Sequence, residues 1–325
     1  VSISPPGLEH KSPGEGANYT PDVGRGLMMH WIRTADGAGQ ADQNAADRAI
    51  ELLEEHRDRP FFLGLGVVRP HLPLVAPGEF YDLYRPEEIA LAQNPPDDLD
   101  DIPQAALDLR PFLWNHMGMS EEQQRMSLHA YYASVSFMDH QVGRTLDALE
   151  RLGLAGDTVV VFFGDHGWHL GEHTHWQKMS LMEDSARAPL IVAAPGRAGA
   201  GRKSRALVEF VDIYPTLAEL GGLEPPGDLE GTSMVPLLDR PDRPWKSAAF
   251  TQAAYEGRIS GRTARTDRYR YIVWEGEGGG EELYDHQTDP GEFTNLAALP
   301  EHGETLERMR AVLAAGWKAA LPPAG

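Results

Sequence analysis

The longest periodic run of apolar positions along the chain predicts a helix that begins near Ser120. Residues 120–123 (SEEQ) have the form of a capping box, which satisfies free backbone N–H groups at a helix start. Gly153 is suited to the residue that follows a helix end. Apolar residues in between recur every three or four positions, so we expect one face to be buried. This face comprises Leu128, Tyr131, Tyr132, Val135, Met138, Val142, Leu146 and Leu149.

Short, continuous apolar runs bounded by Gly or Pro predict buried strands. They occur at Phe61–Gly66, Thr158–Phe163 and Ala188–Pro195, and helical periodicity is seen at 41–57 and 209–220. Strands that are apolar throughout and that alternate with helices are typical of a parallel sheet covered on both faces. The sequence therefore predicts an α/β fold with a mostly parallel sheet sandwiched by helices.

Two segments carry many Pro, Gly or acidic residues and no clear periodicity. Residues 1–40 predict an irregular segment, and residues 69–119 predict a long, ordered excursion of the chain. Because long ordered loops inside compact domains are usually functional, the second segment is a candidate part of a site.

The pattern changes after about residue 246. Residues 258–274 alternate polar and apolar positions, as antiparallel strands with one solvated face do. Residues 301–321 then predict a closing amphipathic helix. We therefore predict two domains: an α/β domain over residues 1–245, and a small antiparallel α+β subdomain over residues 246–325.

Charge and composition limit the classes of partner. The 325-residue chain carries a formal net charge of −20, which disfavours nucleic acid and anionic membranes as partners. No stretch approaches the roughly 18 apolar residues of a membrane span. The chain has no cysteine, which excludes disulfides, thiolate metal sites and a cysteine nucleophile within these residues.

The chemistry is concentrated in residues 164–178 (GDHGWHLGEHTHWQK), directly after an apolar run. Ligands bind outside the carboxyl ends of strands in open parallel sheets, so Asp165 and His166 are candidate metal ligands. The alternative is that Asp165 caps the next segment and His166 is an ordinary loop residue. So many titratable groups in one loop favour a functional site.

Five further residues are candidates for binding or catalysis. Lys178 offers a compact positive charge for a tetrahedral oxyanion, although a solvated surface lysine is the alternative. His71 follows the strand predicted at 61–66 and lies between two prolines, so it is a candidate proton donor at the same sheet edge. Trp168, His169 and His175 are candidates for the substrate entrance.

Several stretches together resemble the type I sulfatases of the alkaline phosphatase superfamily, in particular the iduronate-2-sulfatase-like branch. They include RPFFLGLGVVRPHLPLVAPGEFYDLY, VVVFFGDHGWHLGEHTHWQKMSLMEDSARAPLIVAAPG, VEFVDIYPTLAELGGL and LEGTSMVPLL. The resemblance implies that Asp165 and His166 form half of a divalent metal site, usually calcium, where many relatives have Asn at position 166. It also implies that His71 contacts the sulfate and assists the leaving group, and that Lys178 binds a sulfate oxygen.

The sequence departs from the family pattern in two ways. It has neither the C/S-x-P-x-R motif that yields the formylglycine nucleophile nor paired aspartates before residue 61. The resemblance thus implies that about the first third of the enzyme lies outside this sequence, with formylglycine on that segment or on a complementary N-terminal chain. We expect the isolated chain to be inactive.

Three functional hypotheses follow. The first is a sulfatase that acts on a sulfated sugar or a related sulfate monoester, in the periplasm or secreted as is usual in the family. The second is a phosphate or phosphonate ester hydrolase of the same superfamily. The third is a non-catalytic fragment that binds a metal or an anion.

Overall fold

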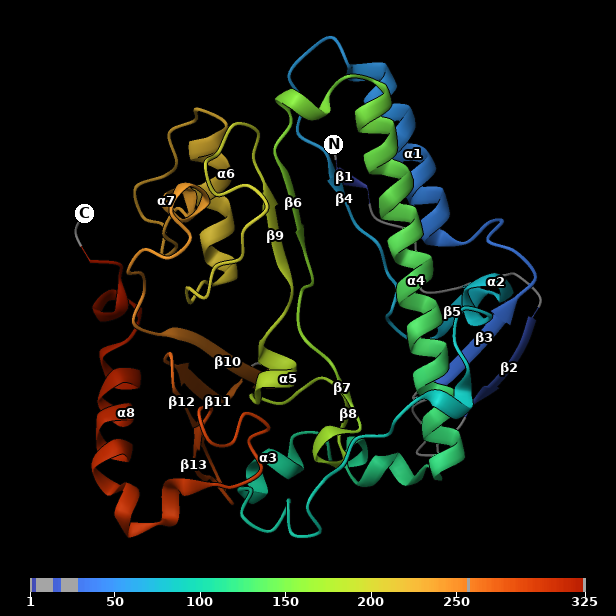
Figure 1. Cartoon of the computed structure of the whole chain (residues 1–325). Coiled ribbons are helices and arrows are strands. Elements are labelled where there is room, and N and C mark those ends of the chain that lie inside the picture. Colours follow the sequence, from blue (N-terminus) through green and yellow to red (C-terminus); the bar gives the residue numbers. More distant parts are fainter. Residues whose placement is uncertain (1, 4–13, 19–28, 256–257, 324–325) are drawn as a thin grey trace. The chain divides into compact units, whose positions relative to one another are not determined.

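The computed structural model describes residues 2–3, 14–18, 29–255 and 258–323 (Figure 1). The chain divides into two compact units, and each unit contains segments that are distant in sequence. Unit 1 comprises Val1–Ala92 and Asn115–Thr158, and unit 2 comprises Gln93–Trp114 and Val159–Gly325. This division differs from the predicted boundary near residue 246, because the C-terminal sheet packs on residues that closely follow the segment 164–178, which we call the histidine-rich loop.

The described residues of unit 1 form two small sheets and two long helices. Strand β3 is the middle strand of the larger sheet, antiparallel to β2 and parallel to β5. Strands β1 and β4 form a second, parallel pair. Their bounds are β1 Ser2–Ile3, β2 Gly14–Asn18, β3 His30–Thr34, β4 Gly64–Leu65 and β5 Leu74–Pro77. The helices are α1 Ala41–His56, α2 Gly78–Tyr81 and α4 Glu121–Arg151.

Helix α4 confirms the predicted start and end. The Ser120 side chain accepts a hydrogen bond from the backbone N–H of Gln123, whose own side chain accepts one from the Ser120 N–H. Gly153 has a positive φ of 73°, which glycine adopts without strain. The helix packs against α1, α2 and β5.

The predicted buried face of α4 was largely wrong. Of the eight apolar positions, only Leu128 and Leu149 are buried, whereas Leu146 is 41% exposed. The buried face instead contains Phe137 together with small or polar residues such as Ala130, Ala133 and Ser134. Hydrophobicity alone does not reveal a face on which small and polar residues are buried beside one aromatic ring.

Other local predictions in unit 1 were wrong in part. Residues 1–40 contain strands β1, β2 and β3, although most of residues 1–28 lie outside the described part of the chain. The excursion over 69–119 includes strand β5, which is fully buried. In the run from Phe61 only Gly64–Leu65 forms a strand, and Phe62 is 71% exposed.

Unit 2 is built around a four-stranded antiparallel sheet near the C-terminus, as the alternating pattern predicted. Its strands pair in sequence order, and helix α8 packs against β11 and β12. The bounds are β10 Ala249–Tyr255, β11 Arg258–Arg265, β12 Tyr269–Trp274, β13 Gly280–Asp285 and α8 Gly303–Ala315. One sheet face packs on Leu181 and Met182, which come directly after the histidine-rich loop.

The remaining elements of unit 2 include the strands that flank that loop and the strands within it. Strand β6 (Val160–Phe163) precedes the loop and pairs antiparallel with β9 (Leu190–Ala193). Both strands were predicted, but they are only partly buried within the described residues, and Phe163 is 48% and Ile191 60% exposed. Two short strands, β7 (His169–Leu170) and β8 (Trp176–Gln177), pair within the loop. The helices are α3 Gln104–Asp108, α5 Glu183–Ala186, α6 Ile213–Leu220 and α7 Val235–Asp239.

A buried ion cluster joins α5 to the C-terminal sheet. Arg270, on β12, is 3% exposed at its side chain and bonds to Glu292 at 2.6 Å and to Glu183 at the start of α5. Glu292 also accepts a hydrogen bond from the Glu183 backbone N–H at 2.7 Å. The start of α5 is therefore fixed by charges as well as by packing.

None of the helices in the described ranges has the combined length and apolarity needed to cross a membrane.

Candidate functional site

The loop after β6 places Asp165 and His166 side by side. The His166 Nδ1 lies 2.7 Å from the carbonyl oxygen of Gly167, which can only accept, so Nδ1 carries the proton. His166 Nε2 then has a free lone pair, and it lies 3.5 Å from an Asp165 carboxylate oxygen. Two donor atoms at this spacing can ligate one cation, so these residues fit half of a metal site.

Backbone contacts hold this turn in place. The Gly164 N–H donates to the carbonyl oxygen of Pro189, and the Gly167 N–H donates to that of Ser185. A Cβ atom on Gly167 would lie 2.0 Å from the backbone oxygen of Asp184. Only glycine allows the turn to approach α5 this closely.

Lys178 lies next to the same two residues. Its ammonium group is 5.2 Å from the centre of the Trp168 ring, and that ring stacks on His166 with centroids 6.0 Å apart. Burial lowers the pKa of Lys178, whereas the charge of Asp165 raises it. We call Asp165, His166, Trp168 and Lys178 the loop site.

The backbone around Lys178 is unusual. Gln177 and Met179, its two neighbours, have positive φ angles of 74° and 84°. Side chains other than glycine rarely adopt this conformation, and it occurs preferentially at functional positions.

The other histidines of the loop point into unit 2. His169 and His175 have no exposed surface, and the His175 ring packs on Trp114 with centroids 4.4 Å apart. Burial lowers the pKa of His175 to about 3, so this ring is neutral at pH 7. A substrate could reach these two side chains only if the loop opened, so their predicted place at the substrate entrance stays a prediction.

The excursion predicted to be functional holds this loop from one side. Asn94 accepts a hydrogen bond from the His173 backbone N–H and donates one to the carbonyl oxygen of Gly171. The Asp98 carboxylate lies 3.0 Å from His173 Nδ1, and both side chains are buried. Burial alone would lower the pKa of His173, but the hydrogen bond and charge of Asp98 outweigh it and raise the pKa.

His71 belongs to unit 1 and follows β4. Its Nδ1 lies 2.7 Å from the carbonyl oxygen of Leu72, so Nδ1 carries the proton and Nε2 is available to another group. The buried Asp42 carboxylate accepts hydrogen bonds from the backbone N–H groups of Val68 and Arg69 and so fixes the turn.

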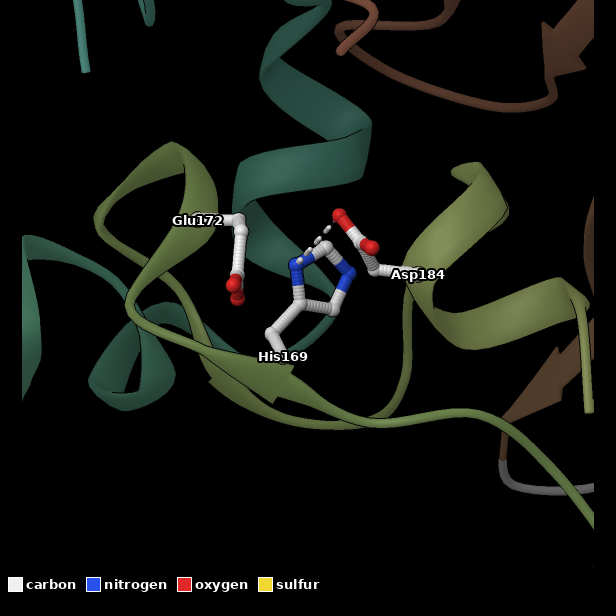
Figure 2. Close-up of side chains that lie close together, drawn as sticks. All are labelled: His169, Glu172 and Asp184. Carbon is white, nitrogen blue, oxygen red and sulfur yellow. Dashed lines mark ion pairs between the residues drawn. The ribbon is translucent and has the colours of Figure 1, made fainter. Parts of the chain in front are cut away.

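A second cluster, beside the loop site, was only partly visible in the sequence. Ligand-capable atoms of His169, Glu172 and Asp184 lie within 4.8 Å of one another (Figure 2). Glu172 is one of the titratable groups of residues 164–178, whereas Asp184 lies outside that segment and was not a candidate. Asp184 lies nineteen residues after Asp165, a spacing that matches no motif. It lies beside His169 and Glu172 only because α5 folds back onto the loop.

Comparisons with known proteins agree with the sequence motifs. The family model described as Sulfatase matches residues 9–223, and that described as N-sulphoglucosamine sulphohydrolase, C-terminal, matches residues 171–318. A protein named sulfatase from Formosa agariphila is 35% identical over 275 residues, which cover 84% of this chain and 53% of that protein. Human iduronate 2-sulfatase is 30% identical over 82% of this chain and 64% of its own length.

Solved structures support the fold. The phosphonate monoester hydrolase of Agrobacterium radiobacter matches with a TM-score of 0.77 and 26% identity, over 89% of this chain and 62% of that one. The predicted alkaline phosphatase-like α/β fold is thereby confirmed. The chain spans about half to two thirds of the length of these relatives.

Proposed function

Because this chain belongs to the sulfatase family, we propose that the protein hydrolyses sulfate monoesters of sugars with the help of a divalent metal ion. The observation that carries the proposal is the loop site. It combines two candidate metal ligands on a glycine-held turn with one ammonium group over the neighbouring Trp168 ring. A sulfate monoester needs cations at its oxygens and a proton at its leaving group.

We assign the metal to Asp165 and His166, with calcium as the ion that the family resemblance implies. The carboxylate and the unprotonated Nε2 would hold the ion from one side. Bound there, the ion would neutralise charge on the sulfate oxygens. The remaining ligands and the formylglycine nucleophile are proposed to come from a segment outside these 325 residues, since this sequence contains no C/S-x-P-x-R motif.

Lys178 and His71 have separate roles in this proposal. Lys178 pairs with a sulfate oxygen, and contact with Trp168 restricts where its ammonium group can lie. When the His71 ring carries a proton on both nitrogens, it donates the one on Nε2 to the leaving oxygen, because its Nδ1–H is held by the carbonyl oxygen of Leu72.

The names of the relatives support a sulfated sugar as the substrate class. They include iduronate 2-sulfatase and an N-acetylglucosamine-6-O-sulfatase of Bacteroides thetaiotaomicron, which is 30% identical over 56% of this chain. We propose that the protein acts in the periplasm or is secreted, as the family resemblance implies.

Phosphonate ester hydrolysis is the second candidate. It is favoured by the likeness to the phosphonate monoester hydrolase of Agrobacterium radiobacter. The same cation and lysine could bind a phosphonate oxygen, so the two candidates differ in relative rates rather than in the residues they need.

The test uses the complete protein, confirmed by mass spectrometry to carry formylglycine. Turnover is compared for a sulfated glucosamine, an aryl sulfate and an aryl phosphonate monoester. We expect kcat/KM to be higher for the sulfates, and to fall by about 10²–10³-fold in Lys178→Ala, as when one oxyanion donor is removed. Lys178→Arg should restore part of the activity, because it keeps the charge.

Lys203→Ala is the matched control, since Lys203 is an exposed lysine elsewhere in unit 2. It should leave kcat/KM unchanged. A faster phosphonate reaction would favour the second candidate, and full activity of Lys178→Ala would remove the assigned role of that residue.

A further inference from the structure

The cluster of His169, Glu172 and Asp184 lies behind the loop site and plays no part in the proposed reaction. His169 comes from β7, Glu172 from the turn that follows, and Asp184 from α5 (Figure 2). Their candidate ligand atoms are one imidazole nitrogen and two carboxylate oxygens, all within 4.8 Å of one another. The three side chains therefore connect two separate elements around one point.

The His169 ring is the observation that points to a ligand. It has no exposed surface, and its Nδ1 has no hydrogen-bond partner. Its Nε2 lies 2.9 Å from the Ser180 hydroxyl, so one nitrogen is satisfied and the other is not. A buried imidazole nitrogen without a partner is costly unless a cation or a donor occupies the space in front of it.

Nδ1 faces a carboxylate across a gap too long for a hydrogen bond. The Asp184 oxygen lies 3.9 Å from Nδ1, as the dashed line in Figure 2 indicates. Two ligands of one tetrahedral zinc ion lie about 3.4 Å apart, given Zn–N and Zn–O bonds of about 2.0–2.2 Å. A movement of about half an ångström would therefore bring both atoms onto one ion.

The charges around the three side chains also favour the binding of a cation. Burial raises the pKa of Asp184 to about 6, and the nearby Glu172 adds to this effect. Burial and the neighbouring His175 and His173 hold the pKa of His169 well below its usual value, and the backbone of Glu172 offsets this only slightly. The ring is thus neutral, as a metal ligand must be, between two carboxylates that repel each other.

The supports of the three groups are rigid. One oxygen of Glu172 accepts the Leu170 backbone N–H at 2.6 Å, which fixes the carboxylate and leaves its second oxygen available. Glu183 bonds to the buried Arg270 and so holds the start of α5, where Asp184 is the next residue. Little ordering would be needed on binding.

We infer that His169, Glu172 and Asp184 form a second metal site, for a divalent transition ion such as zinc, which joins the loop to α5. One imidazole and two carboxylates suit zinc, whereas calcium prefers six to eight oxygens. The ion would act structurally, holding the loop that carries Lys178, and the proposal does not depend on the reaction that the loop site performs.

The test is a zinc titration of the full chain after treatment with a chelator, in competition with a chromophoric chelator. The background variant is Asp165→Asn, which weakens the loop site and leaves the second site intact. We expect one zinc per chain in this background, with an affinity that falls at least tenfold when Asp184→Asn is added. Excess calcium should not displace the zinc.

Asp184→Asn is chosen because its side chain is 43% exposed and the change keeps its shape, whereas His169 is fully buried and His169→Ala could unfold the loop. The matched control is Asp97→Asn, an exposed carboxylate of the same unit, which should leave zinc affinity unchanged. X-ray absorption should show one imidazole in the zinc shell. Failure of the Asp165→Asn chain to bind zinc, or equal affinity with and without Asp184→Asn, would overturn the proposal.

Discussion

Replacing Arg270 with Met should test how far the buried ion cluster stabilises unit 2. The guanidinium bonds to Glu292 and Glu183 and also donates to the backbone oxygen of Leu181 at 3.1 Å. Methionine fills much of the same volume without charge. Glu292, which is 2% exposed at its side chain, would then be a buried charge without its main partner.

The structure sets the expected magnitude. Removing one partner of a buried ion pair costs about 3–5 kcal/mol of the free energy of unfolding. Glu292 gives an independent figure: burial alone would raise its pKa, but the charge of Arg270 and the hydrogen bond with His286 outweigh this and lower it to about 2. A shift of that size from the usual value corresponds to about 3 kcal/mol.

The pH dependence has a definite sign. The folded-state pKa of Glu292 is lowered, so its contribution is complete above about pH 4.5 and is lost as the pH falls toward 2. Wild type should lose stability over this window, and Arg270→Met should lose less because its contribution is already absent.

The assay is urea unfolding followed by tryptophan fluorescence at pH 7 and pH 4. Arg262→Met is the matched control, because Arg262 forms an exposed pair with Glu275 at 2.6 Å with side chains 51% and 47% exposed. Such pairs contribute about 0–1 kcal/mol. If Arg270→Met cost no more than Arg262→Met, the reasoning about buried charge would be refuted.

Two further predictions concern stability. Burial raises the pKa of Glu282 to about 7, so the free energy of unfolding should decline as the pH rises from about 4.5 to 7. In unfolding curves measured across this range, the Glu282→Gln variant should show a smaller decline. Gly167→Ala should destabilise the chain by several kcal/mol, because its Cβ would lie 2.0 Å from the Asp184 backbone oxygen. Gly156→Ala, where the Cβ would meet nothing within 4 Å, should stay within about 0.5 kcal/mol in the same assay.

The sequence predicted elements well where one local rule determined them. The capping box at Ser120, the glycine after α4 and the alternation in the C-terminal strands each depend on neighbouring residues. The buried face of α4 depends on what packs against it, and polar or small residues such as Ser134 and Ala133 give no hydrophobic signal. The rule failed there because tertiary contacts decided the face.

The same distinction applies to the loop. Asp165, His166, Trp168 and Lys178 are close in sequence, and the structure brings all four together. Their closeness in sequence was enough to predict that they lie together, and their roles in a site stay a prediction. Closeness in sequence could not predict the partners of the buried His169 and His173, because Asp184 and Asp98 come from segments on either side of the loop.

The exposed ribbon of β6 and β9 has a consequence for handling the protein in solution. Each strand pairs only with the other in the described part of the chain, so each presents an outer edge of unpaired backbone groups beside exposed Phe163 and Ile191. An edge of this kind can pair with a strand of another chain, and exposed apolar side chains beside it favour aggregation. The large negative charge of the chain opposes such self-association, and salt weakens that opposition by screening. Self-association of the chain should therefore increase with ionic strength. At low salt the repulsion between negatively charged chains outweighs the attraction between the β6–β9 ribbons, and at high salt it no longer does.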